Sequence, residues 1–279
     1  MAEPEAPPPA AVAAPAPAPV RRMKADRHFV TALARGLDVL RAFASGEERL
    51  SNQELAERCA LPKSTITRLT YTLTQLGYLH HVGETGRYRL GLATLGLGGT
   101  TQSRLDVKEA SHPRLQALAD RTGTLVAMAI RDQLSMLYIE CCRSESTLIT
   151  MRLNLGSRMP LPTTAVGRGY LAAAPEEVRQ MLEERLRALN PTGWPAQQLA
   201  IRQAQDDLAQ WGCVTSFGDW RPEINGIAAP LRLSADLPLM VVNAAAATDT
   251  VSADQFLHEV RPALLATLRD IASDYGRTA

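Results

Sequence analysis

The sequence is poor in the residues that build metal and redox centres. Its 279 residues include only four cysteines, Cys59, Cys141, Cys142 and Cys213. No Cys-x-x-Cys pair occurs, the five histidines are scattered, and the adjacent Cys141 and Cys142 cannot easily share one zinc tetrahedron. We therefore expect no metal site, no cofactor, and reduced core thiols of the kind found in cytoplasmic proteins. A redox-reactive thiol at Cys141 or Cys142 is the alternative.

Long hydrophobic runs are also lacking. The richest stretch, residues 227–247, is interrupted by Pro230, Arg232, Asp236, Pro238 and Asn243. A membrane-spanning helix needs about 20 predominantly apolar residues, so we expect no membrane partner. The first twenty residues are mostly proline and alanine, without the basic start and continuous apolar core of a secretory signal. We expect residues 1–26 to form a disordered tail.

The common catalytic motifs are absent as well. The chain has no Gly-x-Ser-x-Gly elbow, no phosphate-binding loop, no Gly-x-Gly-x-x-Gly and no His-Glu-x-x-His. A nucleophile–base pair of His112 with Cys141 or Cys142 is conceivable, but nothing in the sequence brings these residues together. We predict that the protein is not an enzyme. Two alternatives remain. An enzyme would turn over candidate ligands, and a scaffold that binds no ligand would show no thermal shift with any metabolite.

What the chain does contain is a segment typical of a winged helix-turn-helix, residues 51–90. Ser51 and Glu54 have the spacing of a capping box, which predicts a helix over residues 52–60. Pro62 suits the first turn of a second helix, over residues 63–76, and Gly77 suits its end. The β-prone runs 78–81 and 87–90 flank a turn-rich tip and predict a short hairpin, the wing.

The second of these helices and the wing predict a DNA-binding surface. Helix pairs of this kind also occur in proteins that bind no nucleic acid, but the wing and the charge favour DNA. Residues 20–99 hold 12 lysines and arginines against 7 acids, a net +5, whereas residues 100–279 hold 18 against 20, a net −2. Short hydroxyls and cations can contact phosphates and base edges. The predicted DNA-contacting residues are Arg35, Ser51, Lys63, Ser64, Thr65, Thr67, Arg68, Tyr71, Arg87 and Arg89.

Beyond Gly99 the pattern predicts an α+β domain with a mainly antiparallel sheet. A helix over residues 105–121 contains Pro113, which would bend or restart it. Strands are expected at 124–131, 134–141, 147–155, 213–217, 224–231 and 239–246. Helices are expected at 164–173, 175–189, 196–211 and 252–275.

Three features of this second half suggest a pocket for a polar organic ligand. Thr164, Ala165, Val166 and Gly167 begin a helix with small residues, so its free N–H groups favour an anion. Asn243 is an amide within an apolar strand, which is costly unless something bonds it. Asp219 and Trp220 lie in a loop with an arginine. Each feature also has a plain structural explanation: Thr164 as a helix cap, Asn243 bonded to backbone, and Trp220 as packing.

Several separated motifs resemble the IclR-type bacterial transcriptional regulators. They are ARGLDVL (34–40), LPKSTITRL (61–69), LGYL (76–79), GRYRLGLATLGLG (86–98), GSRMPLPTTAVGRGYLAA (156–173) and INGIAAPL (224–231). The resemblance extends from about residue 29 to 272. It implies a winged helix-turn-helix (27–90), a linker helix (91–105) and a GAF-like effector-binding domain (106–279). It also implies a double-stranded DNA operator, a small-molecule effector, control of catabolic genes, and a homodimer or homotetramer paired through residues 30–44 and 92–98.

The resemblance also implies which residues contact the effector. Those positions are Ala165, Val166, Gly167, Asp219, Gly226, Asn243 and Ala245. Some related regulators of small 2-oxo acids carry hydroxyl or thiol side chains where this chain has Gly226 and Ala245. The two smaller residues leave more room, so we expect a larger organic acid, such as an aromatic acid.

Overall fold

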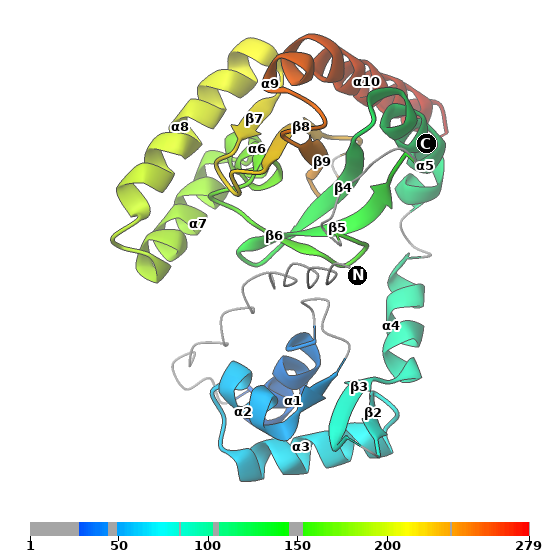
Figure 1. Cartoon of the computed structure of the whole chain (residues 1–279), viewed down its shortest axis with the longest axis vertical. Helices are drawn as coiled ribbons and strands as arrows, with labels where there is room; N and C mark the ends of the chain where they lie inside the picture. The colour runs from blue at the N-terminus through cyan, green and yellow to red at the C-terminus, as the bar shows by residue number, and fades with distance from the viewer. Residues whose placement is uncertain are drawn as a thin grey trace, which may run out of the picture. The chain divides into compact units, whose positions relative to one another are not determined.

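The computed structural model describes residues 28–43, 49–83, 85–102, 106–144, 153–234 and 236–278 (Figure 1). The tail predicted at 1–26 lies outside these ranges. The chain divides between Arg104 and Leu105 into two compact units, each of which is described by itself below. No helix among the described residues is long and apolar enough to cross a membrane.

The first unit packs three helices against a small antiparallel sheet with strand order β1-β3-β2 (Figure 1). A core of Val39, Leu55, Ile66 and Leu79, with their neighbours, holds the helices and the sheet together. The elements are α1 (Thr31–Arg41), β1 (Leu50–Ser51), α2 (Asn52–Cys59), α3 (Lys63–Gln75), β2 (Leu79–Val82), β3 (Arg87–Leu90) and α4 (Leu92–Gln102).

Local signals set the ends of α2 and α3. The predicted capping box is present, because the Ser51 side chain accepts the Glu54 N–H and the Glu54 carboxylate accepts the Ser51 N–H. Pro62 is the N-cap of α3, one position before the first helical turn in which it was predicted. Gly77 follows the C-cap with φ of +75°, a left-handed conformation that favours glycine. The chain then passes close to itself, since a Cβ at Gly91 would clash with the Gly77 carbonyl.

The second unit is built on a six-stranded antiparallel sheet with strand order β6-β5-β4-β9-β8-β7. Its strands are β4 (Leu125–Asp132), β5 (Ser135–Cys142), β6 (Arg158–Pro160), β7 (Val214–Phe217), β8 (Ile224–Leu231) and β9 (Met240–Ala247). Its helices are α5 (Asp106–Thr122), α6 (Ala165–Ala173), α7 (Glu176–Leu189), α8 (Trp194–Trp211), α9 (Ala253–Gln255), the π-helix η1 (Phe256–Val260) and α10 (Arg261–Thr278).

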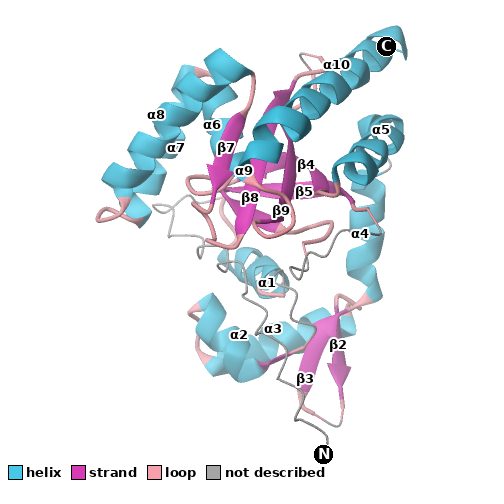
Figure 2. Ribbon diagram, turned by 45° about the horizontal axis from the view of Figure 1, so that its top comes forward, coloured by secondary structure: helices cyan, strands magenta, loops and turns pink. Residues whose placement is uncertain are grey.

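Each face of this sheet carries a separate hydrophobic core (Figure 2). On one face, Val126, Met128 and Val242 pack with α5, η1 and α10. On the other face, Ala127 and Val241 pack with α6, α7 and α8. Successive side chains of a strand point to opposite faces, so neighbouring residues of one strand can serve two different sites.

Two segments depart from the predicted elements. The strand expected at 147–155 lies partly outside the described residues, and residues 153–157 form a loop and turn instead, with Gly156 at φ +85° before the short strand β6. The helix expected from residue 252 is interrupted by η1, where the Arg261 N–H bonds the Phe256 carbonyl. Pro262 follows directly and has no N–H to donate, which accounts for the break in the ordinary α-helical bonding. Pro113 is accommodated within a single helix, α5.

Candidate functional site

Helix α3 presents a polar, exposed surface in the first unit. Ile66 and Thr70 are its buried residues. The Tyr71 side chain is 66% exposed, and the Thr67 hydroxyl donates to the Lys63 carbonyl of the same helix. The predicted DNA-contacting residues of this helix are exposed, apart from the half-buried Thr65: Lys63, Ser64, Thr67, Arg68 and Tyr71.

Four predicted DNA-contacting cations are exposed and have no acidic partner among the described residues. They are Arg35 on α1, Lys63 and Arg68 on α3, and Arg89 on β3. Within the described part of the chain, none of the four forms an ion pair. No described acid therefore neutralises their charge, which would attract a polyanion.

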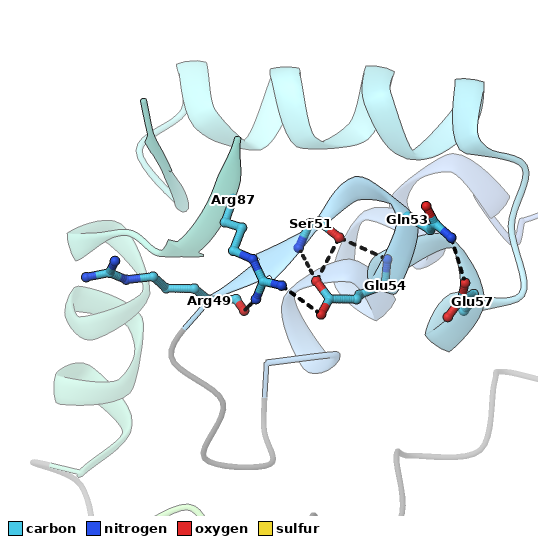
Figure 3. Close-up of polar contacts among 6 residues, drawn as sticks. All are labelled: Arg49, Ser51, Gln53, Glu54, Glu57 and Arg87. Carbon is cyan, nitrogen blue, oxygen red and sulfur yellow. Dashed lines mark hydrogen bonds and ion pairs between the residues drawn. The ribbon is translucent and has the colours of Figure 1, made fainter. Parts of the chain in front are cut away.

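Ser51 and Arg87, by contrast, are engaged within the protein (Figure 3). The Ser51 hydroxyl donates to the Glu54 carboxylate at 2.7 Å. The Arg87 guanidinium donates to the same carboxylate at 3.2 Å and to the Arg49 carbonyl at 3.0 Å. Hydrogen bonds from the Ser51 backbone and side chain hold the pKa of Glu54 below its usual value, and the nearby Arg87 charge adds to this. These contacts tie strand β3 of the wing to helix α2.

The second unit gathers small residues around the start of α6. Thr164 caps this helix by accepting the Gly167 N–H at 3.1 Å, and its hydroxyl donates to the Pro160 carbonyl at 2.7 Å. The cap leaves the amides of Ala165 and Val166 as the remaining donors of the first turn. A Cβ at Gly226 would lie 3.8 Å from the Ala245 Cβ and 3.9 Å from the Ala165 Cβ. The structure therefore brings the α6 start together with β8 and β9.

The sheet beneath α6 holds two buried polar atoms without a partner. Asn243 lies on β9 opposite Ala127 and Ala228, and its Oδ1 accepts no hydrogen bond from a described residue. The Tyr138 hydroxyl on β5 is likewise buried, and it lies near the Asn243 side chain without a hydrogen bond of good geometry to any described residue. Burial raises the pKa of Tyr138 far above its usual range, while its interaction with the Asn243 side chain acts in the opposite direction. Unpartnered buried polar groups are costly, so they mark a place where a ligand could bond.

Arg168 is a site residue that sequence reasoning missed. It is buried on α6, its Nη2 donates to Asp219 Oδ2 at 2.5 Å and to the Thr215 carbonyl at 3.1 Å, and its Nε has no partner within the described chain. Asp219 was predicted as an effector contact, and in the structure it is the counter-ion of Arg168. The one available signal was an arginine within the otherwise small and apolar run AVGRGYLAA.

Trp220 packs beneath α6, whereas a cavity of the second unit lies beside α8. Trp220 packs against the hydrophobic core beneath α6, with the Arg221 guanidinium 5.0 Å from its ring centre. A cavity of 330 Å³ lies between α8, β7, η1 and α10, lined by residues that include Asp207, Cys213 and Arg261. None of the predicted effector residues lines this cavity.

None of the four cysteines forms a disulfide, and three have thiols of reduced acidity. Burial raises the pKa of Cys59 and of Cys213 to about 11, and that of Cys141 to about 12, which keeps them protonated at neutral pH. The Sγ of Cys142 lies 3.7 Å from Nδ1 of His112. The structure therefore brings together one of the two cysteine–histidine pairs that the sequence could not place.

Both units match known protein families. Residues 32–83 match the IclR helix-turn-helix domain, and residues 99–274 match the bacterial transcriptional regulator IclR C-terminal domain. Among individual proteins, the HTH-type transcriptional regulator TsaQ1/TsaQ2 of Comamonas testosteroni is 31% identical over 88% of each chain. The Pca regulon regulatory protein of Pseudomonas putida is 29% identical over 96% of this chain and 94% of its own.

Solved structures give the same result. An IclR family transcriptional regulator from Brucella abortus aligns with a TM-score of 0.79 at 38% identity, covering 93% of this chain and 97% of its own. An IclR homolog from Microbacterium hydrocarbonoxydans, crystallised with 4-hydroxybenzoate, has the same fold, with a TM-score of 0.64 at 22% identity over 86% and 100% of the two chains. These relatives are transcriptional regulators rather than enzymes, and this chain belongs to the IclR family of DNA-binding transcriptional regulators.

Proposed function

We propose that the exposed face of α3 reads the operator sequence. Lys63 and Arg68 supply cations, and Ser64, Thr65, Thr67 and Tyr71 supply hydroxyls, on a helix whose polar side is exposed to solvent. Arg35 and Arg89 contact phosphates or the minor groove. Ser51 and Arg87 act indirectly, because their contacts with Glu54 hold the wing against α2.

A small organic acid binds in the second unit and changes operator affinity. The observation that carries this proposal is the unpartnered Oδ1 of Asn243, buried on the sheet face that α6 covers. The carboxylate bonds the Ala165 and Val166 amides and the positive end of α6. The free Nε of Arg168 supplies a further donor, and the Tyr138 hydroxyl bonds a polar group of the acid.

The acid is larger than a 2-oxo acid, and an aromatic acid fits best. Gly226, Ala245 and Ala165 are small residues that pack together where β8 and β9 meet the α6 start. The fold relative from Microbacterium holds 4-hydroxybenzoate, and the Pseudomonas relative is named for the Pca regulon. By analogy with the latter, the regulated genes encode a catabolic pathway. Regulation requires that the ligand favour one state of the protein, typically by about 1–3 kcal/mol.

The test is a thermal-shift screen of benzoate-type and short 2-oxo acids, followed by operator binding with each positive ligand. We expect an aromatic acid to raise the melting temperature and to change operator affinity about 5- to 150-fold. Asn243→Ala should remove both responses. Asn225→Ala is a matched control, since Asn225 is a buried asparagine on the neighbouring strand that bonds the Val251 carbonyl instead. If Asn243→Ala responds as the parent protein does, the effector binds elsewhere.

Operator recognition uses a homodimer or a homotetramer. One helix-turn-helix covers only a few base pairs, and symmetry is the usual route to a specific site. The first unit exposes leucines on two helices, Leu33 and Leu37 on α1 and Leu92 and Leu95 on α4, and burial against a second copy would remove them from water. Sedimentation at micromolar concentration should give a dimer or tetramer. A monomer that still binds its operator tightly would contradict this proposal.

A further inference from the structure

Three potential metal ligands meet where α5 packs on β5. Nδ1 of His112 lies 3.6 Å from Oε2 of Glu140 and 3.7 Å from Sγ of Cys142. One ligand atom from each of the three residues lies within 4.8 Å of the others. Glu140 and Cys142 are buried, whereas the His112 side chain is 52% exposed. The cluster therefore has a buried side and an opening to solvent.

The two distances from the His112 nitrogen are close to those between ligands of one tetrahedral zinc ion. With Zn–S bonds of about 2.3 Å and Zn–N or Zn–O bonds of about 2.0–2.1 Å, neighbouring ligand atoms are roughly 3.3–3.6 Å apart. The two distances from the His112 nitrogen are 3.6 and 3.7 Å, so only small adjustments would centre an ion among the three side chains.

The fold also holds the ligands in place. Glu140 and Cys142 are two positions apart on β5, so their side chains leave the same face of the sheet. The other carboxylate oxygen of Glu140 accepts the Cys141 N–H at 2.9 Å, which orients Oε2 towards the cluster. His112 lies one position before Pro113, on a helix whose Arg114 is anchored to Asp274 of α10. All three ligands come from elements with buried contacts.

We propose that His112, Glu140 and Cys142 bind one divalent cation of the zinc class. A thiolate, an imidazole and a carboxylate are the donor set that zinc accepts, and three protein ligands leave a fourth position for water on the open side of His112. The ion fastens α5 to the sheet. Binding releases the Cys142 thiol proton, so affinity rises with pH. The site is on the sheet face that α5 and α10 cover, away from Asn243, and it stands independently of the proposed effector.

This proposal departs from the expectation from the sequence that no metal is bound. His112 is separated from Cys142 by 30 positions, and the ligands come from a helix and a strand rather than from a compact motif. Spacing alone therefore gives no signal. Only the packing of α5 on β5 brings the three side chains together.

The test uses the full chain, stripped with a chelator and titrated with Co²⁺ and then Zn²⁺. We expect one Co²⁺ per chain, with a thiolate-to-cobalt charge-transfer band in the near ultraviolet that Zn²⁺ abolishes by displacement. Zn²⁺ alone should raise the melting temperature of the stripped protein by a few degrees. Cys142→Ser and His112→Asn should each weaken binding at least about 100-fold, because each removes a ligand.

Two matched variants make the test specific. Cys141→Ser changes the neighbouring cysteine, which packs on the opposite face of the same strand, and it should bind as the parent does. His258→Asn changes a histidine whose side chain is 70% exposed, and it should also bind normally. The exposed side of His112 makes His112→Asn the variant to use if Cys142→Ser fails to fold. Equal binding by the parent and His112→Asn, no charge-transfer band, or loss of binding in Cys141→Ser would each overturn the proposal.

Discussion

Helices α3 and α6 serve the two proposed sites in opposite ways. Helix α3 buries Ile66 and Thr70 and turns its polar side chains to solvent. Helix α6 buries every residue from Ala165 to Leu171, including a charged arginine. An exposed side chain on α3 can therefore be changed without disturbing the core of its unit. On α6, binding and packing involve the same residues, so the two effects must be separated by experiment.

The largest expected effect is on stability, at Gly167 of α6. A Cβ at this position would lie 2.5 Å from the Pro160 carbonyl oxygen and closer still to the Leu161 carbonyl oxygen, and backbone cannot move aside as a flexible side chain can. We expect Gly167→Ala to lower the free energy of unfolding of the second unit by about 3 kcal/mol or more. Calorimetry would show a lower melting temperature for that unit.

Gly96→Ala is the matched control. Gly96 lies in helix α4, and a Cβ there would have no heavy atom within 4 Å. This substitution should stabilise the first unit slightly, by about 0.5–1 kcal/mol, because alanine loses less conformational entropy in a helix. If the two substitutions change stability equally, tight packing does not distinguish Gly167 of α6 from Gly96 of α4.

The next effect is on DNA binding, at Arg68 of α3. Arg68 is exposed and has no acidic partner among the described residues, so Arg68→Ala should leave the melting temperature unchanged. Operator affinity should fall by about 1–3 kcal/mol if the guanidinium meets a guanine edge. Gln75→Ala, two turns along the same exposed side, should have much less effect. Titrations at several salt concentrations would distinguish a lost base contact from a lost phosphate contact.

The sequence predicted well those features that depend on neighbouring residues. The capping box of Ser51 and Glu54, the left-handed turn at Gly77 and the cap of α6 by Thr164 are local, and all are present. Strands β4, β5, β7, β8 and β9 begin and end within two residues of their predicted positions. Alternating or continuous apolar runs and turn residues suffice for such elements.

Tertiary pairings between distant residues were not predicted. Asp219 looked like a ligand contact because its loop mixes an acid, an indole and a guanidinium, yet its carboxylate pairs with Arg168, 51 positions earlier. The proximity of His112 to Cys142 had no signal at all, since packing of a helix on a strand creates it. Arg87 was predicted to contact DNA, and its pairing with Glu54, 33 positions earlier, was not foreseen. Pairing of this kind is decided by tertiary contacts, which one sequence does not reveal.

A smaller effect on stability is expected at Asp219, whose carboxylate pairs with Arg168 of α6. Its carboxylate neutralises the buried Arg168, but its own side chain is 50% exposed, so solvent screens the pair. Asp219→Asn should lower the free energy of unfolding by about 1 kcal/mol, well below the cost of breaking a fully buried ion pair. The substitution therefore changes the stability of the unliganded protein as well as any response to an effector. Denaturant unfolding of Asp219→Asn beside Asp249→Asn, an exposed surface acid, measures the difference.

The smallest expected effect is a pH dependence in the first unit, set by Glu54. Hydrogen bonds from Ser51 lower the pKa of Glu54 in the folded state, below the usual value of 4.5 that applies when the chain is unfolded. A carboxylate with a lowered pKa contributes stability above pH 4.5 and loses it as the pH falls through its folded pKa. Because the side chain is partly exposed, we expect a contribution of only about 0.5 kcal/mol.

Glu54→Gln keeps a side chain that can complete the capping box but removes the charge that Arg87 contacts. The variant should be less stable than the parent at neutral pH and should match it more closely below pH 4.5. Glu57→Gln, one turn later on α2, alters an exposed carboxylate that accepts only a neutral side-chain bond from Gln53 among the hydrogen bonds drawn in Figure 3. Unfolding curves between neutral and acid pH that change equally in the two variants would show that Glu54 does not couple the wing to α2 through its charge.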